Sequence, residues 1–253
     1  METKIPKIIH YCWFGGKPKP QLILNCIESW KKYCPDYRII EWNEDNFDVH
    51  SSAFVEEAYQ AKQWAFVADY VRAECLLEYG GIYLDTDMEI IRPMDPLLDR
   101  AFFAGFEVRD TVAAGVIGCE KDSDVIRRYA DYYKGIRFFK NDIKDATTSP
   151  VVITEILKKK GLKLNGRKQS FSDCTVYPKP AFYPTGLGWI MGKYGSKTIA
   201  VHHYMDSWGY NSGMGERSKS SKLRLCMLYH ARNILGTDAM YRLGKKLRSR
   251  LHK

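Results

Sequence analysis

Within about the first 45 residues, two short apolar runs flank a stretch with helical periodicity. The runs are KIIHYCWF (7–14) and YRIIEWN (37–43). The stretch between them, LILNCIESWKKY (22–33), repeats apolar residues every three or four positions and stops before Pro35. Short apolar runs bounded by Gly and Pro are typical of buried strands. A strand, helix and strand in this order predict a right-handed βαβ unit, and therefore an α/β fold with a parallel sheet.

The rest of the chain continues this alternation. A long helical pattern covers residues 52–79, and we expect it to break near Gln60–Gln63. Gly80 and Gly81 follow as a left-handed helix stop. Further elements are expected in chain order: strands at IYLDTDMEII (82–91), AFFAGFE (101–107) and VAAGVIGCE (112–120), helices at 123–136 and 150–160, and aromatic and His-rich elements at 182–189 and 197–209.

Positive charge is concentrated at the C-terminal end. Residues 215–253 hold eleven Lys and Arg and two acids, a balance of +9 that equals the formal net charge of the whole chain. We therefore predict one domain over residues 1–214 and a basic amphipathic helical tail over 215–253. The tail is suited to an anionic membrane surface, although a solvated helix docked on the domain remains an alternative. Nucleic acid is disfavoured, because aromatic residues do not alternate with the basic ones.

Two aspartates, Asp85 and Asp87, follow the apolar residues 82–84 within the strand expected over 82–91. On an extended strand residues i and i+2 share a face, so both carboxylates are expected to point into one crevice at the carboxyl end of the sheet. Like charges at that position are costly unless a cation or hydrogen-bond donors offset them. Two hard oxygen ligands suit Mn²⁺ or Mg²⁺ bridging to a diphosphate.

A second charged pair precedes this strand. Asp69 and Arg72 are three residues apart in the predicted helix, so they face the same side. The surrounding sequence, AFVADYVRAECLL, is otherwise apolar, which favours a buried pair over a solvated ion pair on the surface.

Four segments together resemble a known family. They are IPKIIHYCWFGG, SWKKYCPDYRIIEWNED, AFVADYVRAECLLEYGGIYLDTDM and the late HHYMDSW. This combination resembles the DXD-containing glycosyltransferases of family 32, and more distantly the glucosylating domains of large clostridial toxins. The resemblance is dense over residues 4–98 and returns near 201–208. It implies a GT-A fold, with a mostly parallel central sheet and a Rossmann-like nucleotide-binding half.

The resemblance also implies roles for single residues. Asp69 and Arg72 would contact the donor sugar hydroxyls and the neighbouring phosphate, and Asp87 would bind the metal, Mn²⁺ or Mg²⁺, beside Asp85. One of the adjacent His202 and His203 would complete the coordination, and only one can, because neighbours on a strand point to opposite faces. The residues expected to bind the nucleotide sugar are Trp13, stacked on the base, Tyr83 and Asp85 at the nucleoside and sugar, and Ser207 and Trp208 over the diphosphate.

The chain departs from the family at two positions. Relatives often have an Asn in the strand corresponding to VAAGVIG, and Gly-Pro where this chain has Ser149-Pro150. Both lie on the side expected to contact the sugar. The identity of the sugar therefore stays open, with UDP-sugars favoured over GDP-sugars.

The resemblance implies transfer with retention of anomeric configuration. No residue is singled out as a covalent nucleophile, and Asp69, Asp173 and Asp206 are candidates only as acids in suitable segments. A front-face return, in which the departing phosphate takes the proton of the acceptor, needs no nucleophile and is preferred.

Three hypotheses about function follow. The leading one is a metal-dependent transferase that moves a hexose or N-acetylhexosamine to a lipid-linked glycan in capsule, O-antigen or exopolysaccharide synthesis. The alternatives are an aspartate-nucleophile phosphatase and a non-enzymatic membrane-binding module. The N-terminal residues lack a signal-peptide pattern and the seven cysteines are scattered, so we expect a cytoplasmic protein on the inner face of the plasma membrane, with reduced and mostly buried thiols.

Overall fold

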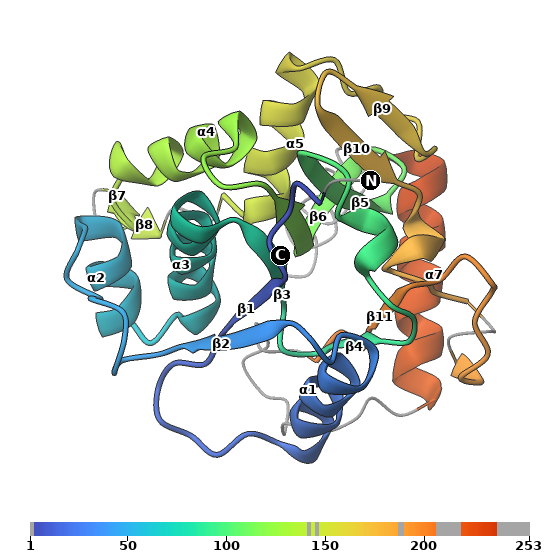
Figure 1. Cartoon of the computed structure of the whole chain (residues 1–253), viewed down its shortest axis with the longest axis horizontal. Coiled ribbons are helices and arrows are strands. Elements are labelled where there is room, and N and C mark those ends of the chain that lie inside the picture. Colours follow the sequence, from blue (N-terminus) through green and yellow to red (C-terminus); the bar gives the residue numbers. More distant parts are fainter. Residues whose placement is uncertain (1–2, 141–142, 145–146, 187–189, 206–218, 237–253) are drawn as a thin grey trace, which may run out of the picture.

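The structure is a computed structural model, and it describes residues 3–140, 143–144, 147–186, 190–205 and 219–236. Its centre is a seven-stranded sheet with the order β2-β1-β3-β6-β5-β10-β9 (Figure 1). The strands, in that order, are Arg38–Trp42, Ile8–Cys12, Gly81–Leu84, Thr111–Cys119, Phe102–Val108, Cys174–Tyr177 and Gln169–Phe171.

Five of the seven strands run in the same direction. β1 pairs in parallel with both β2 and β3, and β10 pairs in parallel with β5. β6 runs antiparallel to its neighbours β3 and β5, and β9 runs antiparallel to β10. The predicted α/β class with a mostly parallel central sheet is therefore confirmed, as is the parallel β1-α1-β2 unit.

Helices cover both faces of the sheet. One face packs against α2 (Ala53–Gln60), α3 (Trp64–Tyr79), α4 (Asp124–Lys134) and α5 (Ser149–Lys159), and the other against α1 (Gln21–Tyr33). The buried strands supply both cores by alternation: Ile82 and Leu84 of β3 belong to the α1 side, and Tyr83 belongs to the α3 side. Six of the seven cysteines are buried and all are free thiols.

The predicted helix break and stop are both present. α2 ends at Gln60 and α3 begins at Trp64, with Lys62 between them in the left-handed region at φ 55°. Gly80 follows α3 at φ 64°, and its N–H donates to Leu76 O at 3.0 Å. A left-handed residue at this position ends the helix and turns the chain directly into β3.

The strand predicted over residues 82–91 is wrong as a single element. β3 ends at Leu84, and the N–H of Met88 donates back to Asp85 O at 3.0 Å to form a turn. β4 (Met88–Ile90) then leaves the central sheet and pairs with β11 (Ala200–His202). Asp85 and Asp87 therefore flank a turn, and the expectation that they share one strand face fails.

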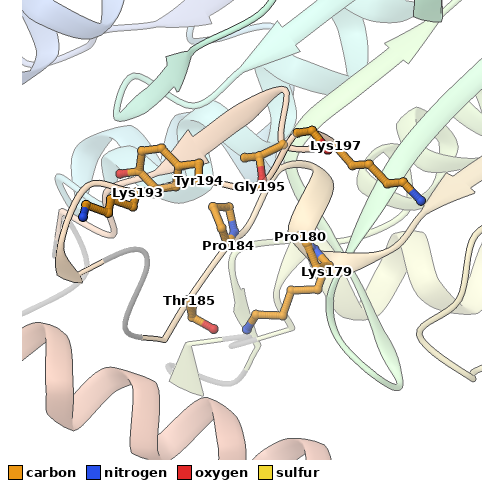
Figure 2. Close-up of a pocket in the computed structure, with 10 residues that line it drawn as sticks. Lys179, Pro180, Pro184, Thr185, Lys193, Tyr194, Gly195 and Lys197 are labelled. Atoms are coloured by element: carbon orange, nitrogen blue, oxygen red, sulfur yellow. The ribbon is translucent and has the colours of Figure 1, made fainter.

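Short elements complete the described chain. β7 (Phe139–Lys140) pairs with β8 (Ile143–Lys144), and two 3₁₀ turns occupy Asp95–Leu97 and Lys179–Ala181. A cavity of about 430 Å³ opens between residues 179–185 and 193–198 (Figure 2).

Part of the basic tail is helical, as predicted. α7 (Lys219–Leu235) contacts the body through Cys226, which packs near Val108 and Tyr204. The second basic stretch of the tail, from residue 239, lies outside the described residues, and the boundary at residue 214 stays a prediction. None of the helices in the described ranges is both long and apolar enough to cross a membrane.

Candidate active site

The site begins at the carboxyl ends of two neighbouring parallel strands. Trp13 follows the last residue of β1, and Asp85 follows the last residue of β3. Because β1 and β3 pair in parallel, both residues lie at one edge of the sheet. This is the edge at which α/β folds bind ligands, and it is where the sequence predicted Asp85 to lie.

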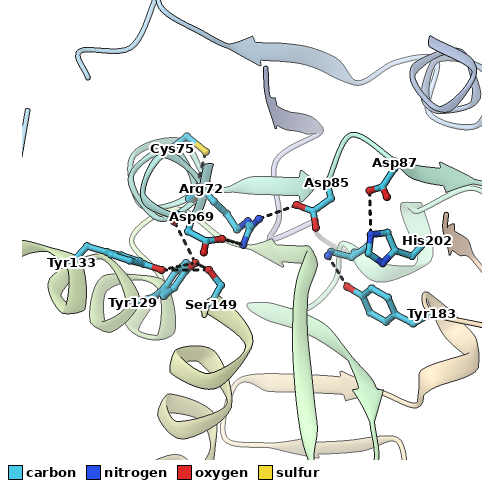
Figure 3. A network of polar contacts seen from close by, with 11 residues as sticks. Asp69, Arg72, Cys75, Asp85, Asp87, Tyr129, Tyr133, Ser149, Tyr183 and His202 are labelled. Atoms are coloured by element: carbon cyan, nitrogen blue, oxygen red, sulfur yellow. Dashed lines mark hydrogen bonds and ion pairs between the residues drawn. The ribbon is translucent and has the colours of Figure 1, made fainter. Parts of the chain in front are cut away.

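Arg72 joins Asp69 to Asp85 (Figure 3). Its Nη1 lies 2.9 Å from Asp69 Oδ1, and its Nη2 lies 2.8 Å from Asp85 Oδ1. The side chains of Asp69 and Arg72 are only 3% and 5% exposed, whereas that of Asp85 is 31% exposed. The predicted pair of Asp69 and Arg72 is therefore buried, and the Arg72 guanidinium also bonds the partly exposed carboxylate of Asp85.

Aromatic and hydroxyl groups contact the buried part of the Asp69–Arg72–Asp85 cluster. The Arg72 guanidinium lies 4.3 Å from the centre of the buried Tyr83 ring. The hydroxyl of Tyr129 donates to the backbone oxygen of Asp69 at 3.2 Å and lies 2.5 Å from Ser149 Oγ. Tyr83 therefore supports Arg72 directly, and its predicted contact with the nucleoside stays a prediction.

Burial controls the charge of Asp69. Desolvation raises the pKa of its carboxyl to about 6 and outweighs the attraction of Arg72. The pKa of Arg72 is raised well above its ordinary value, because nearby aromatic and carboxylate groups outweigh its own burial. Asp69 Oδ2 is buried and accepts no hydrogen bond of ordinary geometry from the described residues, which leaves an acceptor atom for a ligand hydroxyl.

Asp87 lies apart from the Arg72 cluster and contacts residues near the C-terminal end of the domain. His202 Nε2 lies 3.1 Å from Asp87 Oδ1, and the backbone N–H of Met205 donates to Oδ2 at 2.7 Å (Figure 3). Burial opposes the ionisation of Asp87, but His202 and Met205 outweigh it and lower the pKa of this carboxyl. Burial also opposes the charging of His202, yet Asp87 raises the pKa of His202 to about 8.

The two adjacent histidines point to different acids. His203 Nε2 lies 2.9 Å from Glu89 Oε2, whereas His202 faces Asp87. This agrees with the expectation that the two histidines point to opposite faces, and His202 is the one that faces Asp87; which of them binds a metal stays a prediction.

The residues present fit Mn²⁺ or Mg²⁺ in their chemistry. Asp85 and Asp87 supply hard oxygen ligands and His202 an imidazole, whose Nδ1 is buried and has no hydrogen-bond partner among the described residues. Within the described residues, however, no three His, Cys, Asp or Glu side chains converge as a preformed metal group. Asp87 makes one contact through each oxygen, to His202 and to Met205, and each oxygen retains a further lone pair for a cation.

Other predicted residues have different surroundings. The indole N–H of Trp13 donates to Lys17 O at 2.7 Å, and Lys19 Nζ lies 5.7 Å from the centre of the ring. Base stacking on this ring stays a prediction. Asp173 lies in the turn between β9 and β10 near Lys160, away from the cluster around Arg72. The remaining predicted residues, Ser207, Trp208 and Asp206, lie outside the described residues.

Sequence reasoning missed several residues that shape the site. The Tyr183 hydroxyl accepts a hydrogen bond from Val116 N–H at 2.8 Å, close to the turn that carries Asp85. At Gly115 a Cβ atom would lie 2.8 Å from Asp85 Oδ2, so only glycine leaves the carboxylate its present position. Tyr129 was also missed, and Ser149 was noted only as a departure from the Gly-Pro of relatives. The available signals were the two departures, Ser149-Pro150 and the strand VAAGVIG, which contains Gly115 and in which relatives often have an Asn.

Part of the chain is similar in sequence to known proteins. Residues 20–104 match the family model described as the glycosyltransferase sugar-binding region containing DXD motif. The chain is 30% identical over 111 residues to inositol phosphoceramide mannosyltransferase 1 of Schizosaccharomyces pombe, which is 40% of this chain and 33% of that protein. It is 28% identical over 176 residues to mannosyl phosphorylinositol ceramide synthase CSH1 of Saccharomyces cerevisiae, 61% of this chain and 43% of that protein.

The chain thus spans about a third of the first relative and less than half of the second. Among solved structures, the PaToxG glycosyltransferase superposes with a TM-score of 0.47 and 19% identity. The match covers 61% of this chain and 69% of that one.

Proposed function

We propose that the chain transfers a sugar from a nucleotide sugar to a glycan acceptor, because residues 20–104 match the glycosyltransferase sugar-binding region containing the DXD motif. The observation that carries the proposal is the buried Asp69–Arg72–Asp85 cluster, which lies at the carboxyl edge of the sheet one turn away from Asp87 and His202. Most ion pairs in proteins are exposed, whereas this one is buried and ends in a partly exposed carboxylate beside a second buried acid, which is an arrangement typical of functional sites.

The cluster suits the chemistry of a departing diphosphate. Breaking the bond between sugar and diphosphate leaves negative charge on the phosphate, and the fixed guanidinium of Arg72 can stabilise it through charge-assisted hydrogen bonds. Asp69, held by Arg72 and Tyr129, offers Oδ2 to a sugar hydroxyl. A divalent cation bound by Asp87 and Asp85 would supply Lewis-acid stabilisation of the same leaving group.

The finer parts of the proposal rest on the family resemblance. They are a GT-A fold, a hexose or N-acetylhexosamine donor carried on UDP, use of Mn²⁺ or Mg²⁺, and retention of configuration by front-face return. Tyr129 and Ser149 place hydroxyl groups beside Asp69, and the neighbouring carboxylate of Asp85 is paired with Arg72, an arrangement compatible with a route that needs no covalent nucleophile. The acceptor is a lipid-linked glycan of a surface polysaccharide, reached from the inner face of the plasma membrane.

The experiment compares donor hydrolysis by the unaltered chain, Asp87→Asn and Asp173→Asn. With Mn²⁺ and UDP-sugars, we expect hydrolysis by the unaltered chain and the Asp173 control, a loss of roughly 100-fold or more in Asp87→Asn, and no hydrolysis in EDTA. Thermal stabilisation by donor plus Mn²⁺ tests binding separately, because a ligand of the folded state raises its stability. Full hydrolysis in Asp87→Asn would overturn the proposal, and phosphate release from simple esters through an aspartyl-phosphate would favour the phosphatase.

A further inference from the structure

Three buried hydroxyl groups lie together between Asp69 of α3 and the helices α4 and α5. Ser149 Oγ lies 2.5 Å from the Tyr129 hydroxyl and 3.3 Å from the Tyr133 hydroxyl (Figure 3). The two tyrosine oxygens are 3.5 Å apart. Tyr129, Tyr133 and Ser149 are 0%, 1% and 1% exposed. Buried polar groups need partners within the protein, so each hydroxyl proton is directed at a particular acceptor.

The Ser149 hydroxyl serves this cluster rather than its own helix. α5 begins at Ser149 and has Thr148 as its N-cap, and the Ser149 hydroxyl bonds across to α4. Burial raises the pKa of the Asp69 carboxyl, and Arg72 and then Ser149 oppose this effect. Ser149 was expected on the side that contacts the sugar, but its burial means that any effect on a ligand must pass through Asp69.

The contacts of the cluster allow two directions for its protons. In one, Tyr129 donates to the backbone oxygen of Asp69 at 3.2 Å, and the Ser149 proton is then used in the contact with Tyr129. In the other, Tyr129 donates to Ser149, and Ser149 donates to the Asp69 carboxyl. Each hydroxyl has only one proton, so the two directions exclude each other. An ionised carboxylate is the stronger acceptor, so the second direction accompanies a charged Asp69.

The charge of Asp69 matters because of the atom on which a proton would lie. Asp69 Oδ1 accepts a hydrogen bond from Arg72 Nη1 at 2.9 Å, so a proton on this carboxyl belongs on Oδ2. Oδ2 is the atom to which the described residues give no hydrogen bond of ordinary geometry, and therefore the atom offered to a sugar hydroxyl. An ionised Asp69 accepts a charge-assisted bond from that hydroxyl, and a protonated one does not.

We propose that Ser149 is a positioning residue for sugar binding, because it directs its hydroxyl proton at Asp69 and so keeps Asp69 in the charged form that accepts a sugar hydroxyl. Tyr129 and Tyr133 complete the chain of hydroxyl groups that orients the Ser149 proton. The consequence for sugar binding rests on the proposed function, whereas the effect of Ser149 on Asp69 does not.

The other ionisable groups near Asp69 come from four elements. They are Arg72 on the same helix, Asp85 after β3, Tyr129 and Tyr133 on α4, and Cys12 at the end of β1. Burial raises the pKa of Tyr129 and of Cys12 to about 12, and it raises the pKa of Tyr133 well above its ordinary value. The two tyrosines and the thiol therefore stay neutral in the range where Asp69, with a pKa of about 6, changes its charge.

The first test measures the Asp69 carboxyl directly and needs no nucleotide sugar. The chain is isotopically labelled at its aspartate carboxyls, its pH titration is followed by NMR, and Asp69→Asn identifies the signal. We expect the titration midpoint of Asp69 to rise by about one pH unit in Ser149→Ala, since a hydrogen bond to the charged form is lost. Ser149→Thr restores the hydroxyl and should return the midpoint to its original value.

Tyr129→Phe provides an independent variant for the same titration. It leaves the Ser149 proton in place, so it should shift the Asp69 midpoint less than Ser149→Ala does. A larger shift would make Tyr129 the group that stabilises the charge and would overturn the proposal. So would an unchanged midpoint in Ser149→Ala, or a shift that Ser149→Thr fails to reverse.

The second test measures sugar binding at two pH values. Calorimetric titration with Mn²⁺ uses UDP-glucose, UDP-galactose and UDP-N-acetylglucosamine, and the tightest ligand is followed. At pH 6 we expect Ser149→Ala to bind roughly threefold to fivefold more weakly than the unaltered chain, because the charged fraction of Asp69 is smaller, and at pH 8 nearly normally.

The matched control is Thr154→Ala, which removes another buried hydroxyl from α5. Thr154 Oγ1 accepts from Val112 N–H at 2.9 Å, so this variant should lose stability but keep its affinity at both pH values. Equal weakening of Ser149→Ala at pH 6 and pH 8, or the same pH-dependent loss in Thr154→Ala, would overturn a role through the charge of Asp69.

The two tests separate this proposal from the proposed function. If none of the UDP-sugars binds the unaltered chain, the proposed function fails, and the NMR midpoint still decides whether Ser149 controls the charge of Asp69. If a UDP-sugar binds but the midpoint is the same with and without the Ser149 hydroxyl, the proposed function stands and the role of Ser149 is refuted.

Discussion

Asp85 and Asp87 are two residues apart, but different regions of the molecule hold them. The partner of Asp85 is Arg72, thirteen residues earlier in the helix that leads into β3. The partners of Asp87 are His202 and Met205, 115 and 118 residues later, which the β4–β11 pair brings to the site. We call these the Arg72 wall and the His202 wall. The first is built from one local helix and strand, and the second depends on tertiary pairing.

The largest expected effect contrasts the two walls in stability. Replacing Arg72 with Met leaves Asp69 buried without its counter-charge, because Asp69 is 2% exposed. We expect a loss of about 3–5 kcal/mol in the free energy of unfolding, together with loss of donor binding. Urea denaturation followed by tryptophan fluorescence measures the first, and thermal shift with donor the second.

The matched change on the other wall is His202→Gln. Asp87 then keeps the Met205 N–H and gains an amide donor, so we expect a smaller loss of about 1–2 kcal/mol. If both substitutions cost the same, the distinction between a rigid local wall and an adjustable distant one would be incorrect.

The next effect is a difference in pH response between two histidines. Burial lowers the pKa of His10, next to the Arg72 wall, to about 4, whereas Asp87 raises the pKa of His202 to about 8. As pH falls from 6.5 to 4, the unfolded chain takes up a proton that His10 in the folded chain refuses, so stability falls. The contribution of His202 is complete below pH 6.5 and is lost as pH rises through 8.

We therefore expect His10→Gln to flatten the acid side of the stability profile and His202→Gln the alkaline side, by roughly 2–4 and 1–3 kcal/mol respectively. Urea denaturation at each pH, without added divalent cations, measures both. The difference from the unaltered chain isolates His10 from Asp69, whose raised pKa acts in the opposite direction over the same range. An unchanged acid side in His10→Gln would contradict this assignment.

The same comparison explains how far the sequence could be interpreted. The helix break near Lys62, the stop at Gly80 and the Asp69–Arg72 pair follow from periodicity and spacing over a few residues, and all three are present. The parallel βαβ start and the carboxyl-edge position of Asp85 are also local consequences of strand and helix order.

What the sequence could not reveal depends on distant pairing. The turn at Asp85–Met88 looks like a continued strand, because Met88 and Ile90 are as apolar as Ile82 and Leu84; only the pairing of β4 with β11 shows that the chain leaves the sheet. The choice of His202 over His203 has the same origin, since both have the same type of side chain and only register distinguishes them.

The smallest expected effect on stability tests the space that the Arg72 wall leaves for Asp85. In Gly115→Ala, the new Cβ would lie 2.8 Å from Asp85 Oδ2, so the carboxylate must shift and its contact with Arg72 must lengthen. Because the obstructed group is the end of a side chain, we expect a stability loss of only about 1 kcal/mol. Donor hydrolysis should nevertheless fall roughly 10- to 100-fold, since displacement of a positioning group by about 1 Å has effects of that order.

The control is Gly135→Ala, at φ −95° with open space around its Cβ, which should leave hydrolysis unchanged. Normal hydrolysis in Gly115→Ala would mean that Asp85 works equally well when displaced, and that the His202 wall alone sets the geometry of the reaction.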